Sequence, residues 1–161
     1  MPHLSQLAAN AAATGHPLAV MVADLDYFKQ VNDDYGHAAG DAVLVEVAKR
    51  LRKGMRPSDI VARIGGEEFL IVLPGTTPER AREMALRLCE QVGRMPFKVP
   101  GHETPIPVTI SIGLALGGND QIQPRPKTIQ AGADLLDQAD KALYSAKMRG
   151  RNRVTLSRPA A

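Results

Sequence analysis

The sequence predicts an α+β fold, in which helices pack against a central, mostly antiparallel sheet. Three observations lead to this prediction. Residues 60–73 contain two apolar, β-branched runs around the pair Gly65-Gly66, which is typical of a β-hairpin. Residues 18–23 and 107–116 have the composition of two further strands. Segments with apolar residues at helical spacing separate these strands, so hairpin pairing alternates with helices.

Length and composition fit one domain covering residues 1–161, with one core. The net charge of +3, from 20 basic and 17 acidic residues, is too small and too evenly spread to indicate a nucleic-acid partner. Cys89 is the single cysteine, which excludes an internal disulfide and fits a reducing compartment. No apolar run has the length of a membrane span and no secretory signal opens the chain, so we expect a cytoplasmic protein.

The first half of the chain alternates helices with one buried strand. Residues 4–13 are rich in alanine and predict a helix. Residues 18–23 form a strand that is apolar on both faces and runs into Asp24-Leu25-Asp26. Residues 27–35 predict a short helix, and residues 37–40 a loop. A longer helix follows, and its core-facing stripe consists of Leu44, Val47, Ala48, Leu51 and Met55.

The glycine pair of the hairpin predicts a two-residue turn, because both central positions of such a turn need a positive φ. Two carboxylates, Glu67 and Glu68, follow the turn directly. Side chains alternate along a strand, so these neighbours should point to opposite faces. The alternative is a plain surface hairpin with solvated acids.

The second half supplies the remaining elements. They are a helix that Thr77 caps and Pro78 begins, a strand over 107–116, a loop over 117–127, a helix over about 133–149 that Gly150 ends, and a final strand over 152–156.

The end of the first strand and the hairpin together predict a metal site of hard oxygen ligands. If these strands are neighbours, Asp24 comes close to Glu67 or Glu68, and the carbonyl of Leu25 lies beside them. Magnesium prefers few carboxylates and completes its coordination with water and phosphate oxygens. The four histidines are scattered and form no zinc motif. The sequence also lacks a Walker loop, so any nucleotide phosphates must be held by metal, helix N-termini and lysines.

Each candidate residue also has an ordinary structural alternative. The basic residues Lys147, Arg149 and Arg151 can complement the dipole of the last helix. Asp26 can cap the helix that it precedes. Asn32 can belong to a helix-end turn, and Asp41 can be a first-turn acid.

Taken together, four blocks of the sequence resemble one known family. The blocks are Asp24–Asp41, Arg63–Phe69, Thr109–Gly113 and Ala139–Asn152, and the second contains the signature Gly-Gly-Glu-Glu-Phe. In this order they resemble the GGDEF family of diguanylate cyclases over roughly residues 18–156. The resemblance implies a helix-flanked antiparallel sheet with a ferredoxin-like core, related to nucleotidyl cyclase and polymerase palm domains. The family's usual opening, Asp-x-Leu-Thr-Gly-Leu-x-Asn-Arg, is missing, so we expect the C-terminal catalytic part of a longer protein.

The resemblance also implies a role for each matching residue. The metal ligands for Mg²⁺ or Mn²⁺ are Asp24, the carbonyl of Leu25, and Glu67. Glu67 also helps to deprotonate the attacking 3′-hydroxyl, and Glu68 is the second acid of the signature. The residues implied to bind GTP are Lys29, Asn32, His37, Asp41, Gly66, Lys147 and Arg151.

The implied activity is the condensation of two GTP into cyclic di-GMP and two pyrophosphates. Because each chain offers one base pocket, two chains must face each other as a homodimer. Arg56-Pro-Ser-Asp59 matches the family's Arg-x-x-Asp inhibitory motif for the product, and Arg87 resembles a secondary arginine of that site. The alternative for this pair is a loop salt bridge.

The alternatives for the whole chain are a non-catalytic module that senses GTP or cyclic di-GMP, and a cyclase of different base specificity. We also expect an upstream regulatory domain.

Overall fold

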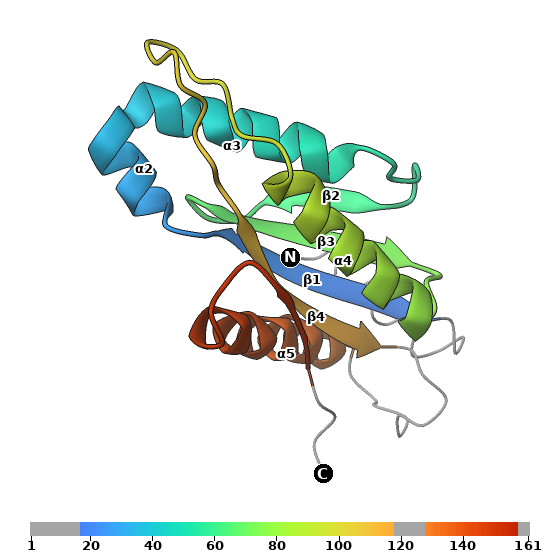
Figure 1. Ribbon diagram of the computed structural model, residues 1–161. Coiled ribbons are helices and arrows are strands. Elements are labelled where there is room, and N and C mark those ends of the chain that lie inside the picture. The colour runs from blue at the N-terminus through green and yellow to red at the C-terminus, as the bar shows by residue number, and fades with distance from the viewer. Residues whose placement is uncertain (1–16, 118–127, 158–161) are drawn as a thin grey trace.

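The computed structural model describes residues 17–117 and 128–157. The helix predicted over residues 4–13, and all but the first residue of the loop predicted over 117–127, lie outside these residues. In chain order the elements are β1 (Leu18–Leu25), α2 (Phe28–Tyr35), α3 (His37–Arg52), β2 (Ile60–Arg63), β3 (Glu68–Pro74), α4 (Pro78–Gly93), β4 (Ile110–Gly117), α5 (Thr128–Met148) and β5 (Val154–Leu156) (Figure 1).

The strands form one five-stranded sheet in the order β2-β3-β1-β4-β5. The pairs β2–β3, β3–β1 and β1–β4 are antiparallel, and β5 joins the edge in parallel with β4. This confirms the predicted mostly antiparallel sheet with flanking helices. Strand β1 lies at the centre and pairs on both sides along its length, which explains why it is apolar on both faces.

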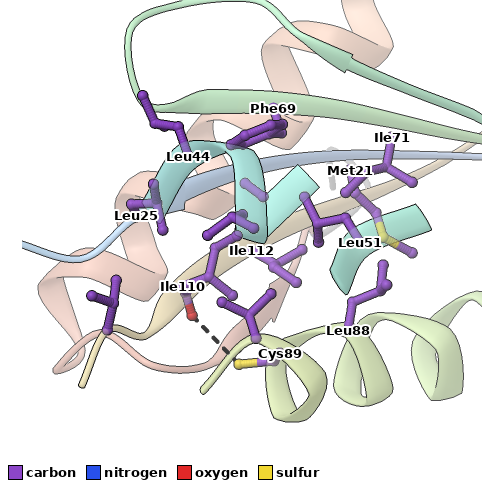
Figure 2. Packing of buried hydrophobic residues seen from close by; sticks show 14 of the residues in the cluster. Met21, Leu25, Leu44, Leu51, Phe69, Ile71, Leu88, Cys89, Ile110 and Ile112 are labelled. Carbon is purple, nitrogen blue, oxygen red and sulfur yellow. Dashed lines mark hydrogen bonds between the residues drawn. The ribbon is translucent and has the colours of Figure 1, made fainter. Parts of the chain in front are cut away.

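The sheet separates two apolar clusters. One lies between the sheet and the helices α2, α3 and α4, and Figure 2 shows its packing around Phe69, Leu51 and Leu88. The other lies between the sheet and α5 and contains Leu143 and Val72. The prediction of one core was therefore wrong, because a sheet with helices on both faces buries both sets of alternating side chains.

Gly113 fixes the distance between α5 and the sheet. A Cβ atom at this position of β4 would meet the backbone carbonyl of Ala139 and the backbone nitrogen of Leu143. The helix backbone therefore lies directly on the strand, which only glycine permits.

The turn between β2 and β3 differs from the predicted two-residue turn. Arg63 pairs with Phe69, and the amide of Ile64 donates to the carbonyl of Glu68 at 2.9 Å, which leaves three residues in the turn. Neither Gly65 nor Gly66 has a positive φ. The glycines provide space here, since a Cβ on Gly66 would meet no atom within 4 Å. Glu67 accordingly lies in the turn, and β3 begins at Glu68.

The loop predicted over residues 37–40 is the first turn of α3. The break between α2 and α3 falls at Gly36, whose φ is 90°, and the amide of Gly40 already donates to its carbonyl at 3.1 Å. This position of the helix is a glycine because α2 packs closely against it. A Cβ on Gly40 would meet the side-chain oxygen of Asn32 and lie 3.2 Å from Phe28. Because α3 begins at His37, its first turn contains no acidic residue, and Asp41 lies beyond it.

Two other predictions about helix ends have clear outcomes. Thr77 caps α4 as predicted, because its side chain accepts from the amide of Arg80 at 3.3 Å. Asp26 does not cap α2, because the capping position is Tyr27 and no side chain bonds to the helix end. None of the helices in the described ranges is long and apolar enough to cross a membrane.

Candidate active site

The candidate site lies where β1 separates from its two neighbours. Asp24 pairs with Glu68 at the end of the β1–β3 ladder, and with Ser111 on β4 one pair before the end of the β1–β4 ladder. One residue further, the amide of Leu25 donates to the carbonyl of Glu67 at 3.3 Å. The sheet therefore brings Asp24 beside both Glu67 and Glu68, where the sequence predicted that it would meet one of the two.

Negative charge is crowded among these three acids. Burial raises the pKa of Asp24, and the ammonium group of Lys147 offsets this only in part. Burial also raises the pKa of Glu67 and of Glu68, and the charge of Asp24 raises both further. Asp140, on α5, adds to the repulsion at Glu68 and contributes to its raised pKa. A cation bound among these groups would relieve the repulsion.

Lys147 brings one positive charge into this group from α5. Its ammonium lies 3.2 Å from Oδ1 of Asp24, 2.8 Å from Oδ1 of Asp26, and 3.3 Å from the carbonyl oxygen of Leu25. Two of these oxygens, Oδ1 of Asp24 and the carbonyl oxygen of Leu25, belong to the predicted metal ligands, and both contact the same ammonium group.

The chemistry of these oxygens fits magnesium. Asp24, Glu67 and the carbonyl of Leu25 are hard donors, and few of them are carboxylates. Within residues 17–117 and 128–157, no three His, Cys, Asp or Glu side chains are arranged as a metal-binding group. Magnesium typically completes such a small set of protein donors with water and substrate phosphates.

Asp26 is a residue of this region for which the sequence offered only a structural alternative, the helix cap. Its side chain is 3% exposed and accepts four hydrogen bonds, from Thr109, Ser111, Lys147 and the backbone of Asn152. Burial alone raises the pKa of Asp26, but the hydrogen bonds outweigh it and lower the pKa below its ordinary value. Asp26 therefore carries a stable buried charge.

The residues predicted to read a purine base lie on α2 and α3. A pocket of about 310 Å³ opens between α3 and the hairpin, and its lining includes Asp41, Leu44, Arg63 and Phe69. The side chain of Asn32 projects from α2 against the backbone of Gly40. Gly40 is the residue directly before Asp41 in the chain. His37 is exposed at the start of α3 and is not part of the pocket lining.

The predicted phosphate-binding residues come from two separate elements. Lys29 is exposed on α2 and, within the described part of the chain, forms no ion pair. Arg151 follows α5, and its guanidinium lies over the ring of Tyr27 at 4.7 Å from the centroid. Its charge acts on Asp24 by lowering the pKa of that acid. Lys147 and Arg151 therefore lie beside the acids.

A second group of predicted residues lies away from the acids, beside the connection from α3 to β2. Arg56 and Asp59 form an ion pair with 3.0 Å between Nη2 and Oδ1, which is the contact that the alternative interpretation required. The same Nη2 donates to the carbonyl of Pro74 at 2.7 Å. Arg87, on α4, places its guanidinium against Gly54, where a Cβ would clash with it. In this region Arg56 and Arg87 are exposed beside the α3–β2 connection, whereas the side chain of Asp59 is fully buried.

Comparison with known proteins assigns the chain to a family. Residues 1–153 match the family model described as diguanylate cyclase, GGDEF domain. The chain belongs to the GGDEF family. The curated diguanylate cyclase DgcP of Pseudomonas aeruginosa is 40% identical over 155 residues, which cover 96% of this chain and 21% of DgcP. This GGDEF domain therefore spans about a fifth of the length of that relative.

Solved structures agree with this assignment. The GGDEF domain of DgcB from Caulobacter crescentus, in complex with c-di-GMP, matches with a TM-score of 0.86 and 30% identity, covering 97% of this chain and 86% of that chain. The active GGEEF domain of a diguanylate cyclase from Vibrio cholerae matches with a TM-score of 0.84 and 30% identity, covering 99% and 94%. The GGDEF fold predicted from the sequence, with its palm-like sheet, is confirmed.

The structure adds residues to the GGDEF site that the sequence did not assign. Thr109, Ser111 and Asn152 all donate to Asp26, although they lie far from it in the chain. All three belong to the blocks that carried the family resemblance. Their presence there was the one signal that could have pointed to them.

Proposed function

We propose that this GGDEF domain is the catalytic domain of a diguanylate cyclase, which condenses two GTP into cyclic di-GMP and two pyrophosphates. The observation that carries the proposal is the pairing of Asp24 with Glu68 at the end of the β1–β3 ladder, beside the ammonium of Lys147. The family assignment supports it, as does the Vibrio cholerae domain with the same Gly-Gly-Glu-Glu-Phe signature, which is described as active.

Asp24, Glu67 and the carbonyl of Leu25 would hold Mg²⁺ or Mn²⁺. The contacts of Lys147 with Asp24 and Leu25 support this, because they show that these oxygens already accept a cation. When bound, the ion lowers the pKa of the attacking hydroxyl and neutralises charge on the phosphates.

The GTP would lie between α3 and the acids. The triphosphate binds to Lys147 and Arg151, which lie beside the acids. Lys29, at the start of α2, binds it as well. Asp41 and Asn32 read the guanine, with His37 beside them. Asp41 suits guanine because a carboxylate accepts from N1–H and the 2-amino group, neither of which adenine offers. The open space at Gly66 lets the phosphates approach the turn.

In each of two steps, the 3′-oxygen of one GTP forms a bond to the α-phosphorus of the other, and the bond from that phosphorus to pyrophosphate breaks. Glu67 and Glu68 are the carboxylates placed to accept the hydroxyl proton. Burial and the charge of Asp24 raise the pKa of Glu68, which makes it the stronger base of the two once Glu67 holds a metal ion. Lys147 and Arg151 would stabilise the charge that develops on the phosphates.

Catalysis would require a homodimer. Each domain holds one GTP, so two domains must face each other across a two-fold axis and supply one nucleophile and one phosphorus each. Holding both substrates in line replaces an improbable encounter and contributes much of the rate. An upstream regulatory domain, in a longer cytoplasmic protein, would control this encounter.

Cyclic di-GMP would inhibit the enzyme at the surface formed by Arg56, Asp59 and Arg87. Arginine can grip a phosphate or the Hoogsteen edge of guanine, and aspartate its Watson–Crick edge. The position of Arg87 beside Gly54 supports its membership of this surface. To bind product, Arg56 must exchange part of its ion pair with Asp59 for the ligand.

Incubation with GTP and Mg²⁺ at several protein concentrations, followed by chromatography of the products, tests the proposal. We expect cyclic di-GMP and pyrophosphate, with a rate per chain that rises with protein concentration. Asp24→Asn should lower the rate by about 100-fold or more, because it removes a metal ligand. Asp137→Asn is the matched control, since Asp137 pairs with Lys141 on the exposed face of α5.

The second candidate, a non-catalytic sensing module, gives a different result in the same experiment. Such a module would bind GTP or cyclic di-GMP and form no product at any protein concentration. A product that contains adenine, formed from mixed nucleotides, would instead indicate a cyclase of different specificity.

A further inference from the structure

Asp26 joins four parts of the chain through one buried carboxylate. Its Oδ1 accepts from Oγ of Ser111 at 2.7 Å and from the ammonium of Lys147 at 2.8 Å. Its Oδ2 accepts from Oγ1 of Thr109 at 2.6 Å and from the backbone amide of Asn152 at 3.0 Å. The end of β1, the start of β4, the last turn of α5 and the α5–β5 connection therefore meet at this side chain.

The backbone around Asp26 is strained. In the described residues, three non-glycine residues have a left-handed backbone: Tyr27 with φ 57°, Arg151 with φ 64° and Asn152 with φ 47°. This conformation is unfavourable for residues with a side chain, and most so for Tyr27 and Arg151. Tyr27 follows Asp26 directly, and the amide of Asn152 is held by Asp26 itself. Strain of this kind persists only where surrounding contacts enforce it.

Arg151 and Asn152 form the strained turn between α5 and β5. This turn carries Arg151, one of the two cations of the site, and Asp26 contacts the other, Lys147. Arg151 lies in the turn, with its amide donating to the carbonyl of Ala146 at 3.0 Å and its guanidinium over Tyr27. Lys147 makes its shortest bond to Asp26. This bond does not involve the oxygens of Asp24 and Leu25, so it can persist when those oxygens hold a metal ion.

We propose that Asp26 is a positioning residue, which holds Lys147 and Arg151 as a preformed cradle for the triphosphate of the substrate. Oδ1 fixes the ammonium of Lys147, and Oδ2 fixes the turn that aims Arg151. Asp26 is buried, so it acts through these two cations. The proposal rests on the proposed function, because it takes the triphosphate as their ligand.

Asp26→Asn tests this role, because it keeps the shape of the side chain and removes its charge. The binding of two ligands is measured by titration calorimetry in the presence of Mg²⁺: a GTP analogue that cannot be cleaved between the α- and β-phosphates, and GMP. We expect the variant to bind the GTP analogue about tenfold or more weakly, since a hydrogen bond to a charged group is lost. Binding of GMP should change by less than about twofold, because the base contacts lie on α2 and α3. Equal losses for both ligands, or no loss, would overturn the proposal.

A double-mutant cycle with Lys147→Met measures whether Asp26 acts through Lys147. If it does, Lys147→Met weakens binding of the GTP analogue much less in the Asp26→Asn background than in the native background. Equal losses in both backgrounds would contradict that part of the proposal. Asp137→Asn, which removes the same charge from an exposed pair, should leave the binding of both ligands unchanged.

Amide hydrogen exchange provides a readout that needs no nucleotide. In Asp26→Asn the amide of Asn152 should exchange faster, while amides in the middle of β1 keep their protection. If the native domain binds no guanine nucleotide, the proposed function fails, and this measurement still decides whether Asp26 fixes the turn.

If Asp26→Asn does not fold, Thr109→Val replaces it. This variant removes one donor to Oδ2 and should weaken binding of the GTP analogue more than binding of GMP. An unchanged ratio would overturn the proposal.

Discussion

Asp24 and Glu68 are partners at the last position of the β1–β3 register, so their side chains leave the same face of the sheet at the point where the strands separate. Like charges directly opposite each other destabilise an antiparallel pair. The concentration of negative charge at this end of the sheet therefore lowers the stability of the fold. Such an arrangement is typical of a functional site.

Glu68→Gln should change how stability depends on pH. The pKa of Glu68 in the folded state is raised above its ordinary value of 4.5, so the folded state binds more protons than the unfolded state just above that pH. Stability therefore falls as the pH rises through the folded pKa. The variant loses this term and should be more stable near neutral pH. Urea unfolding at several pH values between about 4 and 8 measures it. Glu103→Gln, at an exposed position, is the control, and parallel curves for native and Glu68→Gln proteins would contradict the prediction.

Asp41→Asn should weaken GTP binding and reduce base selectivity. The carboxylate accepts from both N1–H and the 2-amino group of guanine, and loss of such a pair costs about 1–3 kcal/mol, or roughly five- to 150-fold in affinity. ITP lacks the 2-amino group, so its binding should fall less than that of GTP. Titration of both nucleotides into native and variant protein measures the difference. Asp33→Asn, exposed on α2, should leave both affinities unchanged; equal losses for GTP and ITP would refute the base contact.

Arg56→Ala should keep turnover and abolish inhibition by added cyclic di-GMP. It should also lower stability by about 1–3 kcal/mol, because the Asp59 side chain is fully buried and would keep only its bond to the amide of residue 56. Removing Asp59 as well should restore part of that loss, since no buried charge then remains. Initial rates with and without product, together with urea unfolding of the single and double variants, test both effects. Unchanged inhibition in Arg56→Ala would disprove the regulatory role.

Gly113→Ala should destabilise the domain by about 2 kcal/mol or more. The added methyl group would meet the backbone of α5 at Ala139 and Leu143, which cannot move without lifting the helix from the sheet. Thermal unfolding of the variant measures the loss. Gly66→Ala is the matched control, because its methyl group would enter open space and should leave the unfolding temperature nearly unchanged. Equal unfolding temperatures for native and Gly113→Ala proteins would show that α5 has room to adjust.

The sequence predicted the elements whose signals are local. The apolar run of β1, the hairpin strands and the cap at Thr77 were recognised because period, branching and capping act within a few residues. A meeting of Asp24 with Glu67 or Glu68 was also predicted, since it required only that β1 and the hairpin be neighbours.

What the sequence did not predict depends on contacts between distant segments. Gly40 was assigned to a loop, but it lies in the first turn of α3, where α2 comes too close for a side chain. Gly65 and Gly66 were assigned a positive φ that the three-residue turn does not need. For Asp26 the sequence offered only a helix cap as an alternative, because its true partners, Thr109 and Asn152, lie 83 and 126 residues away.

The position of β1 in the middle of the sheet affects how the domain can respond to its ligands. Both its edges are bonded and its side chains are almost entirely buried, so it belongs to the part of the fold that opens last. The glycine turn opposite it has free space and few neighbours. Asp24 is thereby anchored to the central strand, while the turn has space to change conformation without disturbing that strand.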